Sequence, residues 1–400
     1  MTTVEQAEKL ILAEAKDFGM ETIPFEQALD RALAEDIKAD RDLPPFNRVT
    51  MDGIAINYKA IQSNISVFKI KTTQAAGDEP VETGRVDECI EIMTGAALSP
   101  SLDTVIQYEN IRINNGEATI LNTEIKKGQN LHLKGADKRE GDIVVCSGQI
   151  ITPAVISVAA SVGKRDLMVR KLPRVVVVSS GDELVDIGVE PSPVQIRKSN
   201  SYTIQAVLAQ HYLRAELAHI PDDPRITREK IGNCLQNYDV ILMTGGISMG
   251  KFDFIPKALE EMQVKTVFHK VSQRPGKPFW FGKHESGVLV FAFPGNPVAT
   301  FMCLHRYFLP WLRASQRLGA KPPVYAVLDK DFTFKPELQY FLQVTLKFSE
   351  EGKLLAIPVE GNGSGDFANL ADTDAFMELP MERSEFKRGE VFRVWPFNNI

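Results

Sequence analysis

Between residues 172 and 318, short apolar runs alternate with helical patterns, and this alternation restricts the fold more than any other feature. The runs include VVVV at 175–178, VILM at 240–243 and VLVFAF at 288–293. A strand that is apolar at every position has both faces buried. Strands that alternate with crossover helices build a doubly wound, mostly parallel sheet. The sequence therefore predicts an α/β domain over residues 172–318.

Two of the expected helices in this domain have recognisable start signals. Ser199 precedes the helical pattern SNSYTIQAVLAQHYL and is suited to the N-cap position. Asp223 and Pro224 precede the pattern of the next helix, as a capping carboxylate and a proline in the first position.

The rest of the chain follows other patterns. Residues 3–36 resemble two helices, 54–138 show short alternating runs separated by turns, 141–151 resemble a hairpin, and 152–163 a helix with Pro153 in its first turn. If this last helix rejoins the N-terminal ones, the β-rich part is an insertion. The predicted domains are an N-terminal helical linker domain (1–43 and 139–171), an inserted β-rich module (44–138), the α/β domain (172–318) and a small, barrel-like all-β C-terminal domain (319–400).

Composition excludes several classes of function. The formal net charge is −6 and no long block of Lys or Arg occurs, which disfavours nucleic-acid binding. The four cysteines form no Cys-x-x-Cys pair, so we expect a reducing cytoplasm and no structural zinc. No apolar run reaches the roughly 18 residues of a membrane span, and no signal-peptide pattern is present. The six histidines show no paired metal-ligand spacing, which disfavours a zinc or redox enzyme.

Three predicted strands end in unusual turns, where open α/β sheets bind their ligands. The turns are SSGDEL (179–184), TGGISMGKFDF (244–254) and FPGNPV (293–298). Glycine lets backbone N–H groups approach an anion, and the N-terminus of a following helix adds partial positive charge. An ordinary strand-to-helix connection explains any one turn, but three at one edge predict a binding site for a phosphate-bearing ligand.

Charged side chains make this site more specific. The carboxylates of Asp182, Glu183, Asp222 and Asp253 fall at or beyond strand ends, where they suit one or two Mg²⁺ ions. Asp223 is explained more simply as a helix cap. The stretch VSQRPGKPFWFG supplies Arg274 and Lys277 on a stiff Pro-Gly-Pro frame, which favours an oxyanion site; a solvated hairpin tip is the alternative.

The segment GGISMGK (245–251) matches most of a phosphate-binding P-loop. The Ser or Thr that would hold Mg²⁺ is missing, and Phe252 stands in its place. A P-loop ATPase or kinase is therefore one hypothesis, but it depends on this segment alone.

Taken together, the motifs resemble a known family, the molybdopterin molybdenumtransferases (bacterial MoeA and the gephyrin C-terminal domain). The matching stretches, in chain order, are DLPPFNRVTMDG, IMTGA, NLHLKGAD, SSGDEL, IRKSNS, TGGISMGKFDF, RPGKP and FPGNPV. They extend from about residue 41 to 300, and the flanking regions fit the same plan. In this family GGISMGK corresponds to a segment in which an acidic residue is usual at the position of Lys251, which argues against the P-loop.

The resemblance implies a fold, a reaction and partners. The expected protein is an elongated, four-domain homodimer whose active site lies between the α/β domain of one subunit and the β module of the other. The implied reaction uses molybdopterin-AMP, molybdate and Mg²⁺, cleaves the phosphoanhydride, and releases AMP and molybdenum cofactor. A transient contact with the molybdopterin adenylyltransferase is also implied.

The resemblance assigns roles to particular residues. The expected catalytic residues are Asp52, Thr94, Asp137, Glu183 and Asp253. The expected substrate-binding residues are Ser180, Gly245, Gly246, Ser248, Gly250, Arg274, Lys277, Pro294, Asn296 and Pro297. The expected Mg²⁺ ligands are Asp182, Glu183 and Asp253, to which the position of Asp222 at a strand end adds a fourth.

The chain departs from the family pattern mainly in the β module. Glu91 and His132 stand where arginine is usual, and Ala136 where glutamate is usual. In the last domain, Gln343 stands where a basic residue is common, whereas Arg274 in place of Lys is a milder change. Lost positive charge favours a rival hypothesis, a non-catalytic molybdopterin-binding or scaffolding relative. Retention of the acidic residues favours the active enzyme.

Overall fold

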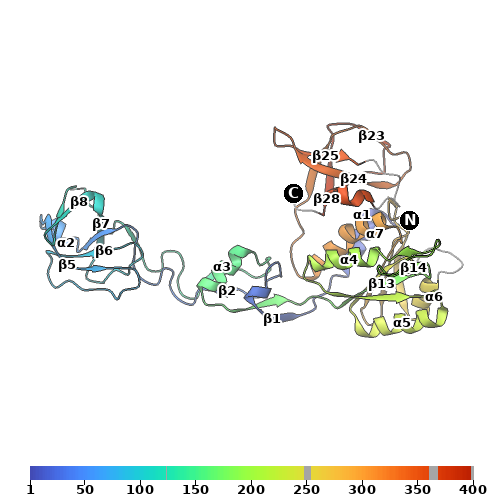
Figure 1. Ribbon diagram of the computed structural model, residues 1–400, viewed down its shortest axis with the longest axis horizontal. Helices are drawn as coiled ribbons and strands as arrows, with labels where there is room; N and C mark the ends of the chain where they lie inside the picture. Colours follow the sequence, from blue (N-terminus) through green and yellow to red (C-terminus); the bar gives the residue numbers. More distant parts are fainter. Residues whose placement is uncertain (123, 247–253, 360–367, 398–400) are drawn as a thin grey trace.

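The computed structural model describes residues 1–122, 124–246, 254–359 and 368–397. The molecule is elongated: the β module lies at one end, and the α/β and C-terminal domains lie together at the other (Figure 1). The chain passes through the narrow linker between them twice, since β1 pairs with β12 and β2 with β11. The β module is therefore an insertion, as the sequence predicts.

The α/β domain contains a six-stranded sheet in the order β16-β13-β17-β21-β20-β18. Its strands are β13 (Val175–Ser180), β16 (Ala215–Ile220), β17 (Val240–Thr244), β18 (Val264–His269), β20 (Trp280–His284) and β21 (Leu289–Phe293). β16, β13, β17 and β21 run parallel, whereas β20 is antiparallel to both of its neighbours. The mostly parallel sheet is confirmed. β20 was not predicted, because Gly282 and Lys283 interrupt its apolar run.

Helices cover both faces of this sheet. They are α4 (Asn200–Ala209), α5 (Pro224–Asn237), α6 (Phe254–Glu261), α7 (Pro297–Cys303), η3 (Leu304–Phe308) and α8 (Leu309–Ser315). Val175 and Val177 pack with α4, α7 and α8, while Val176 and Val178 pack with α5 and α6. The strand is apolar throughout because alternate side chains enter two different cores. None of the described helices is both long and apolar enough to span a membrane.

The two predicted helix starts differ in outcome. The Asp223 carboxylate accepts hydrogen bonds from the amides of Arg225 and Ile226 at 2.9 and 2.8 Å, so this cap is confirmed. Ser199 occupies the N-cap position of α4, but its side chain makes no capping hydrogen bond. Its backbone is already helical, and its carbonyl accepts bonds from both the amide and the hydroxyl of Thr203. The predicted N-cap position of Ser199 is therefore confirmed, but a side-chain cap by its hydroxyl is not.

The linker contains less helix than predicted. Residues 3–36 form one α-helix, α1 (Val4–Ala13), and then β1 (Met20–Pro24) and the short η1 (Phe25–Gln27). The second predicted helix is wrong because exposure alternates along β1, which pairs antiparallel with β12 (Asp166–Arg170). The predicted hairpin at 141–151 is also wrong: β11 (Ile143–Val145) pairs with β2 (Ile37–Lys38).

The two helices of the linker region belong to different cores. Helix α3 (Pro153–Ser161) begins at Pro153, as predicted, and buries Val155 and Ala159 in the core of the linker. Helix α1 instead buries Val4, Ala7 and Ile11 in the core of the α/β domain. The prediction that α3 rejoins the N-terminal segment is therefore confirmed for Ala28, Leu33 and Ile37, which share its core, but wrong for α1, which packs elsewhere.

The β module is a six-stranded sheet in the order β7-β4-β6-β5-β9-β8. Its strands are β4 (Gly53–Ile56), β5 (Val67–Gln74), β6 (Glu88–Ile92), β7 (Thr104–Gln107), β8 (Ile111–Asn114) and β9 (Glu117–Ile120), with the short helices α2 (Lys59–Gln62) and η2 (Tyr108–Asn110). Beside it, β3 (Arg48–Val49) pairs with β10 (Leu131–His132). The β-rich character predicted from the alternating runs is confirmed.

The C-terminal domain is a six-stranded sheet, β19-β24-β25-β22-β28-β26, and closes on itself because β24 also pairs with β26. Its elements are β22 (Val324–Leu328), β24 (Gln339–Phe348), β25 (Leu354–Pro358), η4 (Ala368–Asp372), β26 (Ala375–Leu379) and β28 (Val391–Pro396), with a side pair of β23 (Phe332–Thr333) and β27 (Glu385–Phe386). The predicted barrel-like form is confirmed. β19 (Gln273–Arg274) reaches this sheet from the α/β domain.

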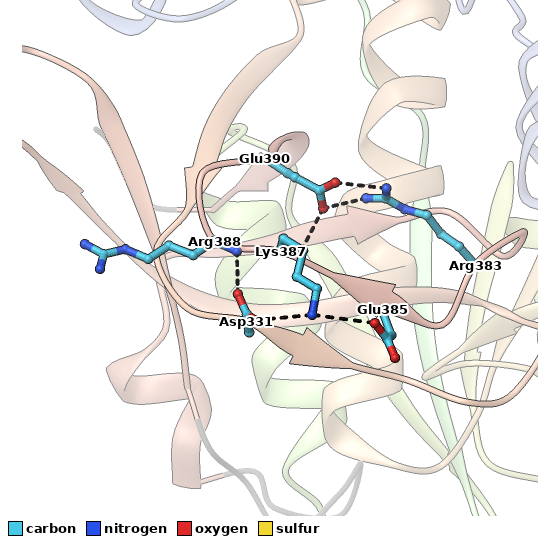
Figure 2. Close-up of polar contacts among 6 residues, drawn as sticks. All are labelled: Asp331, Arg383, Glu385, Lys387, Arg388 and Glu390. Carbon is cyan, nitrogen blue, oxygen red and sulfur yellow. Dashed lines mark hydrogen bonds and ion pairs between the residues drawn. The ribbon is translucent and has the colours of Figure 1, made fainter.

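Two ionic networks of the C-terminal domain differ in burial. Figure 2 shows the exposed one, in which Arg383 donates two bonds to Glu390 and Asp331 accepts from Lys387 and the Arg388 amide. Exposed pairs of this kind contribute about 0–1 kcal/mol.

The other network is buried and centred on Arg306, whose side chain is 2% exposed. The guanidinium bonds Glu8 of α1 at 2.9 Å and lies 3.5 Å from Glu378 of β26. Trp395 of β28 also donates to Glu378, at 2.6 Å. Arg306, in η3, thus joins this helical segment of the α/β domain to α1 and to the C-terminal sheet, which fixes the C-terminal domain on the α/β domain.

Candidate functional site

The three unusual turns meet at one edge of the α/β sheet. β13 pairs with β17 as far as Ser179 and Thr244, and β17 pairs with β21 as far as Thr244 and Phe293. The Gly245 amide donates to the Phe293 carbonyl at 3.3 Å, which ties the second turn to the third. The parallel strands therefore bring together turns that are far apart in the sequence.

A buried hydroxyl lies beneath the glycine pair of the second turn. Ser180 is 7% exposed, and its Oγ has no hydrogen-bond partner among the described residues. At Gly246, with φ +66°, an added Cβ would lie 2.5 Å from this Oγ and 2.4 Å from Ile255 Cδ1. The site thus requires glycine at 246 and leaves a buried hydroxyl that a ligand could satisfy, since an unsatisfied buried polar group costs about 1–3 kcal/mol.

Two carboxylates at this edge hold each other in place. The Asp182 amide donates to the Asp222 carboxylate at 3.3 Å, and the Asp222 amide donates to the Asp182 carboxylate at 3.1 Å. Both side chains are exposed. The Glu183 carboxylate folds back against Gly181, where an added Cβ would lie 2.2 Å from its Oε2. Asp182 and Asp222 therefore present fixed oxygens to solvent at the strand ends.

The predicted Mg²⁺ site is only partly within the described residues. Asp253, Ser248 and Gly250 lie outside them. In the described part of the chain, no three His, Cys, Asp or Glu side chains converge so as to hold a metal ion by themselves. Mg²⁺ is commonly bound by one or two carboxylates together with waters and substrate phosphates. The oxygen donors of Asp182 and Asp222 fit that chemistry.

The third turn is braced from two sides. The Thr300 hydroxyl donates to the Pro294 carbonyl at 2.6 Å, and the Asn200 amide group donates to the Gly295 carbonyl at 2.7 Å. Asn296 then takes the N-cap position of α7, whose first residue is Pro297. Because Gly295 also lies against Gly245, the predicted residues Pro294, Asn296 and Pro297 border the glycine pair.

Sequence reasoning missed several residues near this edge. His219 Nδ1 lies 3.1 Å from Ser179 Oγ, and burial lowers the pKa of His219, with the charges of Lys198 and Lys230 adding to the effect. Lys198 itself lies 3.8 Å from Asp186. The signal for Lys198 was the stretch IRKSNS, which contains two basic residues just before α4.

The RPGKP loop lies where the α/β and C-terminal domains meet. Arg274 in β19 pairs with Tyr340, and its guanidinium carbon is 5.9 Å from the centre of the Phe334 ring. The buried Gln273 donates to the Gly276 carbonyl at 3.3 Å and supports the loop from beneath. The loop is thus braced rather than a free hairpin tip. Arg274 and Lys277 are both exposed, and their contact with a ligand stays a prediction.

In the β module, Asp52 and Thr94 lie side by side. The Thr94 amide donates to Asp52 Oδ1 at 2.6 Å, and this bond, with that of the Thr94 hydroxyl, lowers the pKa of the Asp52 carboxyl. Gly53 follows Asp52 because an added Cβ there would lie 2.0 Å from the Ile106 carbonyl oxygen. The two predicted residues therefore form one preorganised, ionised unit.

Beside them is a second polar group, which sequence reasoning did not find. Glu91 accepts hydrogen bonds from the Tyr108 hydroxyl at 2.8 Å and from the Thr73 hydroxyl at 2.7 Å. Burial raises the pKa of Tyr108 to about 12, and the Glu91 carboxylate adds to the rise. The carboxylate that replaces the usual arginine is thus satisfied within the module.

Asp137, the third predicted residue of the module, bonds to His132, another residue that departs from the family pattern. His132 Nε2 lies 2.9 Å from Asp137 Oδ1, and Arg48 lies 3.0 Å from His132 Nδ1. We call Asp52, Thr94 and Asp137 the β-module half, and Ser180, Asp182, Asp222 and Gly246 the sheet-edge half. Within one chain the two halves lie in domains at opposite ends of the molecule (Figure 1).

Comparison with family models and curated proteins covers almost the whole chain. Residues 2–163 match the MoeA N-terminal region (domain I and II), 176–314 the "Probable molybdopterin binding domain", and 325–397 the MoeA C-terminal region (domain IV). A molybdopterin molybdenumtransferase of Synechocystis sp. is 37% identical over 399 residues, covering 98% of this chain and 99% of the relative. That of Haemophilus influenzae is 29% identical over 408 residues, covering 100% of both chains.

Solved structures agree with the sequence matches. The crystal structure of a molybdopterin biosynthesis MoeA protein from Pyrococcus horikosii covers 100% of both chains with a TM-score of 0.85 and 27% identity. A second structure of a MoeA protein from Pyrococcus horikoshii OT3 covers 99% of this chain and 100% of its own, with a TM-score of 0.82 and 25% identity. Fold, motifs and relatives thus lead to one conclusion: this chain belongs to the MoeA family of molybdopterin molybdenumtransferases, the transferases of molybdenum cofactor biosynthesis.

Proposed function

We propose that this protein inserts molybdate into molybdopterin-AMP, cleaves the phosphoanhydride, and releases AMP and molybdenum cofactor. The observation that carries the proposal is the sheet edge, where the Ser180 hydroxyl, without a partner among the described residues, lies beneath Gly246 and near the Asp182–Asp222 carboxylate pair. Hydroxyl and backbone N–H donors suit phosphate oxygens, and fixed carboxylates suit the cation that accompanies them.

The roles of the edge residues follow from the hydrogen bonds that the described residues make. Because the Gly245 amide is already bonded to Phe293, we assign ligand donation to the Ser180 hydroxyl and the Gly246 amide. Asp182 and Asp222 would hold Mg²⁺, which when bound stabilises charge that develops on the phosphoanhydride oxygens. Attack by an oxygen of water or molybdate on phosphorus breaks the anhydride bond, and the AMP phosphate leaves. Arg274 and Lys277 supply positive charge for the anionic ligand.

The proposal includes a homodimer in which each active site combines the sheet-edge half of one subunit with the β-module half of the other. The separation of the two halves along one elongated chain supports it, because a single ligand cannot contact both in the same subunit (Figure 1). A cytoplasmic location and a transient contact with the adenylyltransferase that makes molybdopterin-AMP belong to the same proposal.

The direct test is to incubate the purified protein with molybdopterin-AMP, Mg²⁺ and molybdate, and to quantify AMP. The proposal predicts that AMP release depends on all three components. If the ligand binds tightly but the anhydride stays intact, the protein is instead a non-catalytic molybdopterin-binding relative. The specific observation behind that second candidate is Glu91, a carboxylate in place of the usual arginine, although its bonds to Tyr108 and Thr73 show that it is accommodated.

A further inference from the structure

Arg48, His132 and Asp137 form a continuous row of side chains on the β module. Arg48 and His132 are direct partners across the antiparallel pair β3–β10, and the guanidinium lies 3.0 Å from His132 Nδ1. The opposite ring nitrogen, Nε2, lies 2.9 Å from Asp137 Oδ1. One imidazole therefore connects a cation to a carboxylate that belongs to the β-module half.

The chemistry of the row fixes the protonation pattern of the ring. A guanidinium has donors only, so Nδ1 must be the acceptor and carries no proton. An ionised Asp137 only accepts, so the proton of the neutral ring must lie on Nε2 and be donated to Asp137. Arg48 thus selects the Nε2–H tautomer, and this tautomer holds Asp137 in place.

The row lies beside the other members of the β-module half. The Val49 amide donates to the Ala96 carbonyl at 3.0 Å, and the Thr50 amide donates to the Asn130 carbonyl at 3.0 Å. The segment from Arg48 to Asp52 therefore runs between the loop that carries Thr94 and the strand that carries His132. The nearby cation Lys134 is paired with Asp42 at 3.6 Å, so its charge is directed elsewhere.

Exposure and spare donors suggest what the row binds. Arg48 is exposed, and within the described residues its guanidinium bonds to His132 alone, which leaves several N–H donors. The His132 and Asp137 side chains are 30% and 58% exposed. A guanidinium with spare donors suits an oxyanion, whereas an unneutralised Asp137 would repel one.

We propose that Arg48 is a positioning residue of the β-module half: it sets the His132 tautomer, holds and neutralises Asp137, and directs its spare N–H groups to an oxyanion. This role rests on the proposed function, since the oxyanion is either molybdate or the phosphate of AMP. Arg48 thereby supplies, from the neighbouring strand, positive charge that His132 does not carry.

The first test uses the full-length protein without substrate. In protein labelled with ¹⁵N-histidine, we expect the ring nitrogen shifts of His132 to report a fixed Nε2–H tautomer. Because Asp137 still accepts from Nε2–H, Arg48→Ala should move these shifts part of the way toward the averaged values of exchanging tautomers, and Arg48→Lys, which keeps a cationic donor, should restore the fixed state. The matched control is Arg85→Ala, which removes an exposed arginine of the same module that pairs with Asp87 at 2.7 Å. A tautomer unchanged in Arg48→Ala would overturn the proposal.

The second test separates binding from turnover. We expect Arg48→Ala to raise KM for molybdate or the Kd of AMP about tenfold, the effect of losing a charge-assisted hydrogen bond, and to lower kcat by a smaller factor because Asp137 loses part of its support. The titration that responds identifies the oxyanion. Arg48→Lys should recover most of the affinity, and Arg85→Ala should lose none.

The two proposals fail in distinguishable ways. If wild-type protein releases no AMP, the proposed function fails, while the tautomer and AMP-binding measurements still test the role of Arg48. If neither the KM for molybdate nor the Kd of AMP changes in Arg48→Ala, the proposal is wrong. If Arg48→Ala lowers the melting temperature, and Arg48→Lys restores it without restoring the affinity, Arg48 is a structural residue and the proposal is also wrong.

Discussion

The sheet-edge half and the β-module half hold their functional groups by different means. At the sheet edge, parallel strands and glycine turns fix the positions, and Ser180 Oγ has no partner among the described residues. In the β module, the Asp52 carboxylate accepts from the Thr94 amide, and side chains are paired with each other in Arg48–His132–Asp137. One half depends on backbone shape and the other on side-chain hydrogen bonds.

This difference explains where the chain departs from its family. At Gly246 of the sheet edge a new side chain would collide with the side chains of Ser180 and Ile255, so changes there are restricted. In the β module a substitution can be compensated by a new partner, as Tyr108 and Thr73 do for Glu91. In the β module, Glu91 and His132 stand where the resemblance leads us to expect arginine, while Gly246, Asp182 and Asp222 of the edge match the expected pattern.

The largest expected effect tests whether the two halves have separate stability. Arg306→Leu leaves Glu8 and Glu378 in a buried network without their cation, and we expect a loss of about 3–5 kcal/mol in the free energy of unfolding. Hydrogen exchange under denaturant should show the loss in the α/β and C-terminal domains but not in the β module, whose cores are distinct. Arg383→Leu, in the exposed network of Figure 2, should cost about 1 kcal/mol or less. Equal losses in all domains would contradict separate stability.

The second prediction concerns backbone shape at the edge. Gly246→Ala places a Cβ 2.5 Å from Ser180 Oγ at φ +66°. We therefore expect the free energy of unfolding to fall by about 2–4 kcal/mol and the AMP-releasing activity to be lost as well. Gly116→Ala is the control, because Gly116 has φ +78° with no atom within 4 Å of the added Cβ. It should cost only about 1–2 kcal/mol and leave activity intact. Chemical denaturation and the AMP assay check both, and an active Gly246→Ala protein would refute the steric account.

The third prediction concerns the carboxylates of the edge. Asp182→Ala and Asp222→Ala should each reduce Mg²⁺-dependent AMP release by at least about 10- to 100-fold, while stability changes by less than about 1 kcal/mol because both side chains are exposed. Asp223→Ala is the neighbouring control. It removes the cap of α5 at a cost of about 1 kcal/mol and should keep activity. Titration with Mg²⁺ measures the difference, and an unchanged Mg²⁺ requirement in the first two variants would exclude them as ligands.

The smallest expected effect is the titration of Asp52. Because Thr94 lowers the folded-state pKa of this carboxyl, the pair stabilises the fold above the ordinary carboxyl pKa, and this stability is lost as pH falls through the folded pKa. Thr94→Val removes the hydroxyl and should raise the pKa of Asp52 toward its ordinary value, without abolishing the bond from the amide. Carboxyl ¹³C shifts followed against pH check this. An unshifted Asp52 titration would mean that the hydroxyl does not contribute.

Sequence reasoning succeeded where local pattern and fold coincide. The fully apolar runs at 175–178 and 240–243 are strands, and the turns after them meet at one edge because parallel pairing puts the strand ends together. It failed at Met20–Pro24, where a short strand follows a helix and gains its partner only from β12, far along the chain.

The unpredicted parts of the site have the same physical cause. Arg48 and His132 are 84 positions apart and become neighbours only through the pairing of two short strands. In the sequence alone, Glu91 only indicates that a positive charge is missing. In the folded protein, its carboxylate accepts hydrogen bonds from the hydroxyls of Thr73 and Tyr108. The residue types at positions 91 and 132 could be read from the sequence. Their hydrogen-bond partners, Tyr108 and Thr73 for Glu91 and Arg48 for His132, could not.

The most direct test of the central claim, a site shared between subunits, is complementation in mixed dimers. One subunit carries Asp222→Ala at the sheet edge and the other carries Asp52→Ala in the β module, and each variant alone should be nearly inactive. If each site combines one half from each subunit, random mixing restores one intact site per mixed dimer, or about a quarter of wild-type AMP release. Mixed dimers that form but stay inactive would contradict the shared site.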